Sequence, residues 1–199
     1  MFHSRFWFFL GFLFLCGCVP PLDGRSQPEG TTNVSGSIPA AQGQQFMVAA
    51  ANPHAAEAGR HILRLGGNAV DAAITMQMVL NLVEPQSSGI GGGGFLLYYD
   101  SASDELSTYD GRETAPAGAT GDMFLDFFEE PQAFFEAVVG GKSVGVPGLL
   151  RMLELAHQHH GKLPWKSLFS PAIKLAERGF AISPRLHDLV ARDKYLRTS

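Results

Sequence analysis

Residues 84–95 of the chain have the sequence EPQSSGIGGGGF, a proline followed by a run of glycines. Pro85 disfavours helical geometry in the residue before it, so the helix predicted upstream ends near Glu84. Residues 95–100, which follow the glycines and are apolar except for Asp100, are typical of a strand. The run formally contains G-x-G-x-x-G, but a dinucleotide site needs a strand before this motif and a helix after it, and here the order is reversed. This order argues against a Rossmann domain. The glycines instead allow a close approach of backbone segments.

Two helices are predicted before this run. Asn52 is a favourable N-cap and Pro53 fits the first helical position, so the first helix begins there. The pair Gly66-Gly67 ends it, because glycine readily takes the left-handed conformation that terminates a helix. The second helix follows at once, and its apolar stripe continues almost to the proline. Both packing faces are rich in alanine, which indicates close contact with a sheet, and the apolar residues 46–51 suit a buried strand.

A hairpin and further helices are predicted after the glycine run. Residues 95–100 and 106–110 are strand-like and are joined by the polar turn 101–105, so we expect an antiparallel pair. Apolar residues at helical spacing predict three helices at the end of the chain. Between the hairpin and these helices, five phenylalanines lie close together in the sequence among acidic residues. We expect a partner surface to cover so many aromatic side chains: Phe124, Phe127, Phe128, Phe134 and Phe135.

The composition excludes several classes of protein. The 199 residues contain 15 Lys and Arg against 19 Asp and Glu, a net charge of −4, which excludes a strongly basic nucleic-acid binder. No cysteine follows Cys18, so the folded part has no disulfide framework, zinc knuckle or thiol nucleophile. Three histidines lie in the last turn of a predicted helix, where the helix dipole favours the imidazolium form: His157, His159 and His160. Without a nearby carboxylate or cysteine to complete a ligand set, we expect neither a metal nor a cofactor.

The N-terminal segment is interpreted as an export signal. Residues 1–17 hold one firm positive charge and an apolar run too short to span a membrane. The following Cys18 closes a sequence, LCGC, that resembles the bacterial lipobox, so we expect lipidation of Cys18 and a lipid-anchored protein of the bacterial cell envelope, facing the periplasm or the exterior. An ordinary secreted protein cleaved nearby is the alternative. Residues 18–45, rich in Pro, Gly and Gln, are predicted to be a flexible tether to the folded residues 46–199.

One arginine after the predicted hairpin is a candidate for binding. Gly111 leaves room around Arg112, and Pro116 stiffens the chain behind it. The residue types alone leave two interpretations open. Arg112 can form an ion pair with Asp110 or Glu113 at the rim of the sheet, an arrangement that is common and contributes little stability. Alternatively, its planar guanidinium can bind a carboxylate of a ligand through two parallel hydrogen bonds.

Several ordered blocks of the chain together resemble the γ-glutamyltranspeptidase family. The blocks are ANP at 51–53, GGNAVDAA at 66–73, EPQSSGIGGGGF at 84–95, DGRETAP at 110–116, SVGVPG at 143–148 and PAIKLAERGF at 171–180. The resemblance implies an α+β fold of the N-terminal-nucleophile hydrolase type, an αββα four-layer sandwich, with residues 46–199 as the N-terminal portion of a large subunit. Members of the family are proenzymes that cut themselves, and the threonine freed at the start of the small subunit attacks the γ-glutamyl amide.

The resemblance also implies roles for particular residues. Arg112 matches the arginine that holds the α-carboxylate of the γ-glutamyl group, as in glutathione, and the glycine run matches a buried packing element near the substrate. The nucleophile of the family lies in a Thr-Thr-His block, and no threonine of this chain precedes a histidine. We therefore expect the 199 residues to be the front of a large subunit, to require the rest of that subunit and the small subunit as partners, and to be inactive alone.

Two alternatives remain open at this point. A β-lactam acylase of the same superfamily, acting on glutaryl or cephalosporin substrates, has similar front blocks. A non-catalytic binding lipoprotein that kept the front half of the fold would carry the same motifs without needing the nucleophile.

Overall fold

The computed structural model describes residues 40–196, and the chain divides into two units, residues 1–41 and 42–199. The second unit carries all the helices and strands given below. The predicted signal peptide, the expected lipidation site Cys18 and residues 18–39 of the predicted tether lie outside the described residues. Within residues 40–196, no helix combines the length and the apolar character that crossing a membrane requires.

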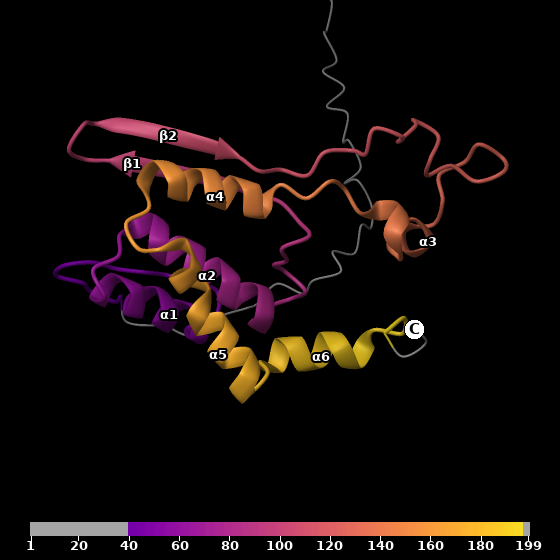
Figure 1. The fold of residues 1–199 in the computed structure, drawn as a ribbon. Coiled ribbons are helices and arrows are strands. Elements are labelled where there is room, and N and C mark those ends of the chain that lie inside the picture. The colour runs from indigo at the N-terminus through magenta and orange to yellow at the C-terminus, as the bar shows by residue number, and fades with distance from the viewer. Residues whose placement is uncertain (1–39, 197–199) are drawn as a thin grey trace, which may run out of the picture. The chain divides into compact units, whose positions relative to one another are not determined.

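The first two helices form a packed pair. α1 spans Pro53–Arg64 and α2 spans Ala69–Val83 (Figure 1). Gly66, in the connection between them, has a φ of 87°, a left-handed conformation that glycine adopts without steric penalty. The predicted glycine stop of the first helix is therefore confirmed. α2 ends just ahead of Pro85, which confirms the prediction for the second helix as well.

Asparagine side chains start both helices. The Asn52 side-chain oxygen accepts a hydrogen bond from the backbone N–H of His54 at 3.0 Å. Asn68 caps α2 by accepting from the N–H of Asp71, and the Asp71 carboxylate accepts from the N–H of Asn68, both at 3.0 Å. This reciprocal pair satisfies two backbone donors that a helix start leaves without partners. The local sequence thus fixes where each helix begins.

The predicted hairpin is present. β1 spans Phe95–Asp100 and β2 spans Glu105–Asp110, paired antiparallel along their whole length. One face of β1 turns Leu96 and Tyr98 towards the core. The opposite face is also apolar and is uncovered within the described residues, with side chains 57 to 68% exposed at Phe95, Leu97 and Tyr99. A strand that is apolar on both faces is typical of a sheet covered on both sides.

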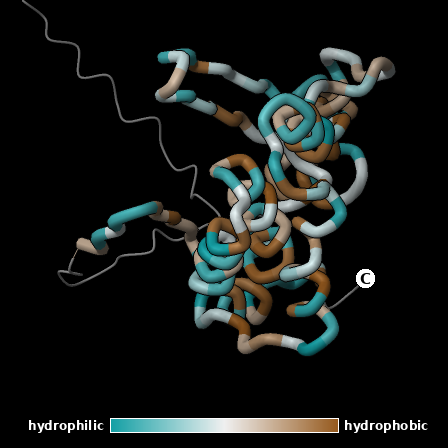
Figure 2. Tube along the Cα trace, turned by 60° about the vertical axis from the view of Figure 1, so that its left-hand side comes forward, coloured by the Kyte–Doolittle hydropathy of each residue, from teal (hydrophilic) through white to brown (hydrophobic). Residues whose placement is uncertain are grey.

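The remaining elements are α3 (Phe134–Val138), the 3-10 helix η1 (Gly141–Ser143), α4 (Leu149–His160), the 3-10 helix η2 (Trp165–Phe169), α5 (Ser170–Arg178) and α6 (Pro184–Arg192). α4 lies between the hairpin and α2, and it buries Leu149, Met152, Leu153 and Ala156 in the main core (Figure 1). Along the trace, hydrophobic residues alternate with hydrophilic ones through the helices, as expected of elements that bury one face (Figure 2). Helices therefore cover one face of a sheet, and the α+β prediction is confirmed.

The strand predicted at residues 46–51 is wrong. The backbone there is irregular, and Met47 is 60% exposed. A strand requires a neighbouring strand to pair with, and the described strands pair only with each other. The apolar run therefore has no ladder to join within residues 40–196.

The three histidines at the end of α4 each have a hydrogen-bond partner. Nε2 of His157 donates to the carbonyl of Leu163 at 2.8 Å. The Tyr109 hydroxyl lies 3.0 Å from Nδ1 of His159 and 2.7 Å from Nε2 of His160. Desolvation raises the pKa of Tyr109, so its neutral hydroxyl can donate to one imidazole and accept from the other. Within residues 40–196, no three His, Cys, Asp or Glu side chains are grouped closely enough to hold a metal ion.

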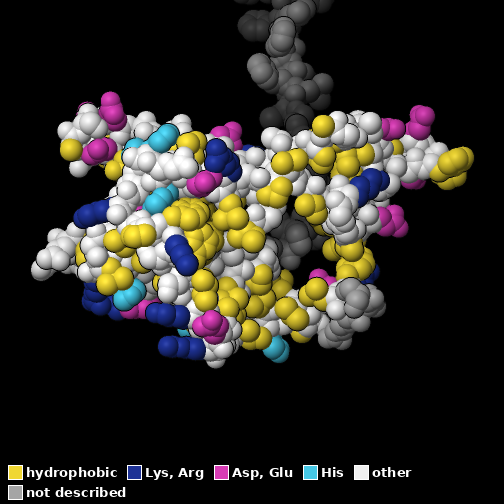
Figure 3. All heavy atoms as spheres, in the orientation of Figure 1, with side chains coloured by type: hydrophobic (Ala, Val, Ile, Leu, Met, Phe, Trp, Pro, Cys, Tyr) yellow, Lys and Arg dark blue, Asp and Glu magenta, His cyan; other side chains and the backbone are white. Residues whose placement is uncertain are grey.

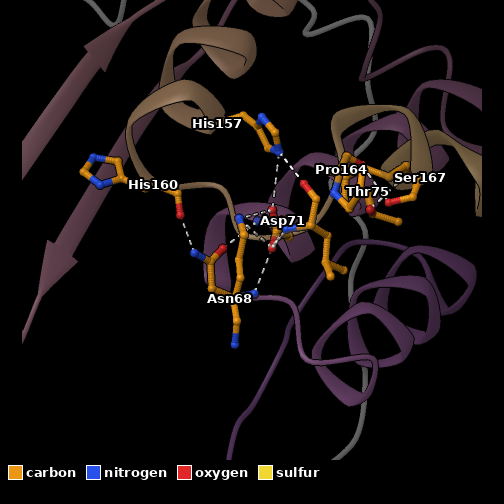
Figure 4. A network of polar contacts seen from close by, with 10 residues as sticks. Asn68, Asp71, Thr75, His157, His160, Pro164 and Ser167 are labelled. Atoms are coloured by element: carbon orange, nitrogen blue, oxygen red, sulfur yellow. Dashed lines mark hydrogen bonds and ion pairs between the residues drawn. The ribbon is translucent and has the colours of Figure 1, made fainter.

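A buried carboxylate ties α2 to the connection after α4. Asp71 is 0% exposed, and besides Asn68 it accepts hydrogen bonds from the N–H groups of Lys162, at 3.1 and 3.2 Å, and Leu163, at 3.1 Å (Figure 4). Asn68 also donates to the carbonyl of His160. The N-terminus of one helix thereby fixes the C-terminus of another that is about 90 residues away in sequence.

Candidate functional site

Arg112 lies on a segment that is fixed at both ends. Just before it, Gly111 and Gly94 exchange backbone hydrogen bonds of 2.9 and 3.2 Å, which extend the hairpin by one pair. Just after it, the carbonyl of Thr114 accepts from the N–H of Val146 at 2.9 Å, in a short antiparallel bridge. The segment is therefore held between the glycine run and residues 143–148, two of the blocks that the sequence singled out.

Glycines allow three backbone segments to cross beside Arg112. The carbonyl of Gly92 accepts from the N–H groups of Gly148 and Leu149, both at 3.2 Å, and so binds the start of α4. A Cβ atom on Gly148 would lie 2.4 Å from the carbonyl oxygen of Gly111, and one on Gly93 would lie 2.5 Å from the same oxygen. These distances exclude any side chain, which confirms the close backbone approach that the sequence predicted.

Replacing Gly148 by alanine is expected to lower the free energy of unfolding by about 3 kcal/mol, because the new methyl group meets rigid backbone and not a flexible side chain. Gly148 has a φ of −113°, a conformation that alanine adopts easily, so the effect is steric. Gly118→Ala is the matched control, since no atom lies within 4 Å of its added Cβ. Chemical denaturation of both variants measures the difference, and equal stabilities would show that the crossing is not tightly packed.

The side chain of Arg112 is largely open to solvent. It is 71% exposed, and its Nε lies 3.4 Å from a carboxylate oxygen of Glu113, which is 33% exposed. The ion pair that one interpretation of the sequence predicted is therefore present, although such an exposed pair contributes little stability. Within residues 40–196, Glu113 is the one acidic residue that forms an ion pair with this side chain. The largely exposed guanidinium remains available to a ligand while Glu113 orients it.

Arg112 lines an open cavity of about 330 Å³ together with residues from three segments: Glu113, Thr114, Ala115, Pro116, Met123, Phe124, Lys142, Ser143, Val144 and Gly145. The lining contains two cations, Arg112 and Lys142, and one carboxylate, so the cavity is suited to an anionic group. The sequence alone did not predict Lys142 or Ser143 as neighbours of Arg112. The bridge between Thr114 and Val146 places them there, and the local sequence does not predict this pairing.

A polar cluster anchors the start of the glycine run to α2. Nε2 of Gln77 donates to the Ser88 hydroxyl at 2.6 Å and to Oδ1 of Asn81 at 2.8 Å. The Ser88 hydroxyl in turn donates to the same Asn81 oxygen at 2.9 Å. Sequence reasoning missed these residues, because their polar side chains interrupt the apolar stripe of α2 without forming a motif. The cluster fixes the loop whose glycines pack beside Arg112.

Comparison with known proteins gives a consistent result. A family model described as gamma-glutamyltranspeptidase matches residues 55–199. The glutathione hydrolase proenzyme of Bacillus subtilis (strain 168) is 47% identical over 159 residues, which are 79% of this chain and 27% of that protein. The chain thus spans about a quarter of the length of the curated relatives it matches.

Solved structures are similar as well. The γ-glutamyltranspeptidase from Pseudomonas nitroreducens complexed with L-DON is 36% identical, with a TM-score of 0.72, over 77% of this chain and 45% of that one. A cephalosporin acylase from Bacillus halodurans is 28% identical, with a TM-score of 0.57, over 77% of this chain and 30% of that one.

Proposed function

The chain belongs to the γ-glutamyltranspeptidase family, and on this premise we propose that it forms the substrate-binding front of an enzyme that hydrolyses or transfers the γ-glutamyl group of glutathione and related amides. The observation that carries the proposal is the guanidinium of Arg112, which is 71% exposed and lines a cavity with a second cation, Lys142. A γ-glutamyl group offers such a site its free α-carboxylate.

The proposed contact uses the geometry of the guanidinium. A planar guanidinium binds a carboxylate through two parallel hydrogen bonds, which fixes both the distance and the orientation of the ligand. The γ-glutamyl head group also carries an α-ammonium, and the carboxylate of Glu113 lies 3.4 Å from Arg112. A ligand with both charges can therefore pair with both residues at once, so the site selects a free amino-acid head group.

The proposed reaction proceeds through an acyl-threonine. The nucleophile is a threonine freed at the start of a small subunit, with its own α-amine as the base. Its hydroxyl attacks the γ-carbonyl, the amine of the substrate leaves, and water or an amino acid resolves the ester. The residues of this chain do not react in these steps. Arg112 binds the head group and thereby holds the γ-carbonyl at a fixed position relative to the nucleophile.

The 199 residues alone are expected not to cleave γ-glutamyl-p-nitroanilide, because none of their threonines lies in a Thr-Thr-His block. The complete proenzyme that the proposal requires, this chain followed by the rest of the large subunit and the small subunit, is expected to cleave it. Release of p-nitroaniline measures both. Cleavage by the purified 199-residue chain would contradict the proposed nucleophile. An inactive complete proenzyme that still binds γ-glutamyl compounds would favour a non-catalytic binding lipoprotein.

We assign two of the uncovered apolar surfaces, the outer face of β1 and the rings of Phe134 and Phe135, to the partners of this chain within the proenzyme. The outer face of β1 carries three exposed apolar side chains, Phe95, Leu97 and Tyr99, and a second sheet packed there would complete the αββα sandwich. Phe134 and Phe135 are 58 and 51% exposed, and the rest of the large subunit is their proposed partner. For the same reason, the 199-residue chain is expected to aggregate in isolation.

The proposed location is the bacterial cell envelope, with residues 1–17 as the signal peptide, Cys18 as the lipidated N-terminus and residues 18–45 as the tether to the folded residues 46–199. The lipobox-like sequence around Cys18 supports this proposal. Mass spectrometry of the membrane fraction is expected to find a diacylglyceryl group on an N-terminal Cys18. An unmodified N-terminus at another residue would contradict the assignment.

The β-lactam acylase alternative is weakened by Glu113. A glutaryl group has a terminal carboxylate for Arg112 but no α-ammonium for Glu113. The two carboxylates, one of the ligand and one of Glu113, would then lie near each other and share the charge of Arg112. The complete proenzyme is therefore expected to prefer γ-glutamyl amides over glutaryl amides. A substrate screen with both classes tests this, and a preference for glutaryl amides would favour the acylase.

A further inference from the structure

A fixed turn presents two phenylalanines to solvent. Residues 125–131, which we term the phenylalanine turn, close through a bridge between Leu125 and Pro131. Oδ1 of Asp126 accepts from the N–H groups of Phe128, at 2.8 Å, and Glu130, at 3.0 Å. The N–H of Asp126 also donates to the carbonyl of Glu130 at 2.8 Å. The turn therefore holds its conformation through its own hydrogen bonds.

The exposed residues of the turn combine rings with negative charge. Phe127 and Phe128 are 93 and 79% exposed, and their ring centroids lie 5.5 Å apart in an edge-to-face pair. Glu129 and Glu130 are exposed beside them, and neither has an ion pair within residues 40–196. The rings of Phe134 and Phe135, by contrast, contact each other, and Phe135 also contacts the ring of Tyr195. A rigid, apolar and acidic tip is typical of a docking element.

A groove on α1, α2 and α5 has the complementary character. Its volume is about 460 Å³, and its apolar lining is formed by Ala58, Ile62, Leu65, Val79, Pro171 and Leu175. We term it the α5 groove. Lys174 and Arg178 line it, four residues apart on one helix, and neither has an ion pair within the part of the chain that is described. The one lining carboxylate, Glu57, is paired with Arg60, so the charge left without a partner is positive. Two like charges at this spacing destabilise a helix slightly, and an anionic partner would relieve both.

We propose that the phenylalanine turn of one copy of the chain docks into the α5 groove of another. The two rings enter the apolar groove, and Glu129 and Glu130 pair with Lys174 and Arg178 at its rim. The groove is of the size that holds drug-sized ligands, so two phenyl rings fit within it. This inference goes beyond the proposed function, and it does not depend on catalysis.

The contact is between copies. The loop between β2 and α3, which contains the turn, extends away from α1 and α5 (Figure 1). Hydrophobic and acidic side chains protrude together at the tip of that loop, whereas Lys and Arg gather near α1 and α5 (Figure 3). The proposed contact joins two different surfaces, the turn of one copy and the groove of the other. A pair of copies therefore still has one unoccupied turn and one unoccupied groove, so further copies can add and the number of copies per assembly rises with protein concentration. The acidic residues beside the rings disfavour an anionic bilayer as the partner.

Charge reversal tests the proposal with the full chain. One variant carries Glu129→Lys and Glu130→Lys, and the other carries Lys174→Glu and Arg178→Glu. Each alone is expected to lose self-capture, measured between tagged and untagged copies, by about tenfold or more, because turn and groove then repel. Mixed together, the two variants are expected to capture each other, since the basic turn of one meets the acidic groove of the other. Circular dichroism checks that both remain folded.

A second pair of variants separates docking from general aggregation. Phe127→Ser with Phe128→Ser is expected to reduce self-capture at least as strongly as charge reversal. Ile182→Ser with Val190→Ser removes two other exposed apolar residues, 51 and 48%, that lie outside the turn, the groove and the outer face of β1, and is expected to leave self-capture unchanged. Equal loss in both pairs, or failure of the charge-reversed variants to capture each other, would overturn the proposal. Binding of the chain to phosphatidylglycerol vesicles through the phenylalanines, without self-capture, would instead assign the turn to a membrane.

Discussion

Replacing Arg112 by lysine in the complete proenzyme is expected to raise KM for γ-glutamyl-p-nitroanilide about 10- to 100-fold. Lysine keeps the positive charge but lacks the planar guanidinium that donates hydrogen bonds to both carboxylate oxygens. A hydrogen bond to a charged group contributes about 1.5–3 kcal/mol, and each 1.4 kcal/mol is tenfold in affinity. Steady-state kinetics with both enzymes measure the change, and kcat is expected to fall less than KM rises if the lost contact mainly binds the head group.

Arg151→Lys is the matched control for this prediction. Arg151 is 74% exposed and pairs with Glu154 on the same helix, so it resembles Arg112 in exposure and in having one acidic neighbour. It does not line the Arg112 cavity. Its substitution is expected to leave KM unchanged. An unchanged KM in Arg112→Lys would refute the assignment of Arg112 as the ligand of the α-carboxylate.

Replacing Asp71 by alanine is expected to lower the free energy of unfolding of the chain by about 4 kcal/mol. The carboxylate is completely buried, and it accepts hydrogen bonds from the N–H groups of Asn68, Lys162 and Leu163. Alanine leaves these donors without an acceptor, and each buried, unpaired group costs about 1–3 kcal/mol. The contact between the start of α2 and the end of α4 is lost at the same time. Chemical denaturation measures the effect.

Two further variants calibrate the Asp71 prediction. Asp71→Asn keeps one oxygen acceptor in place and is expected to be less destabilising than the alanine variant. Asp188→Ala removes a carboxylate that is 59% exposed on α6 and is expected to change stability by less than about 0.5 kcal/mol. A loss of less than about 1 kcal/mol in Asp71→Ala would show that the network in Figure 4 does not hold the two helices together.

The sequence predicted the elements whose signals are local. Asn52 and Asn68 begin helices because a short polar side chain can accept from the backbone a few residues ahead, and this chemistry needs no distant partner. The hairpin followed from two strand-like runs on either side of a polar turn. The close backbone crossing at the glycine run was also predicted, because only glycine leaves the space for it.

The failures have a common physical cause, which is dependence on distant partners. Residues 46–51 have the composition of a strand, but a strand needs an edge to pair with, and none lies beside them in the described part of the chain. The placement of Lys142 in the Arg112 cavity depends on the pairing of Thr114 with Val146. The histidines in the last turn of α4 are oriented by Tyr109 on β2 and by the carbonyl of Leu163, contacts that the dipole argument did not anticipate.

The α-carboxylate of the substrate gives the most direct test of the central claim, that Arg112 binds this group. The measurement compares kcat/KM of the complete proenzyme for γ-glutamyl-p-nitroanilide and for its α-carboxamide analogue, in the wild type and in Arg112→Ala. The wild type is expected to prefer the free carboxylate by about 10- to 100-fold, and the variant to lose that preference because both substrates then lack the contact. If Arg112→Ala retained the full preference of the wild type, another group would bind the α-carboxylate and the account would be contradicted.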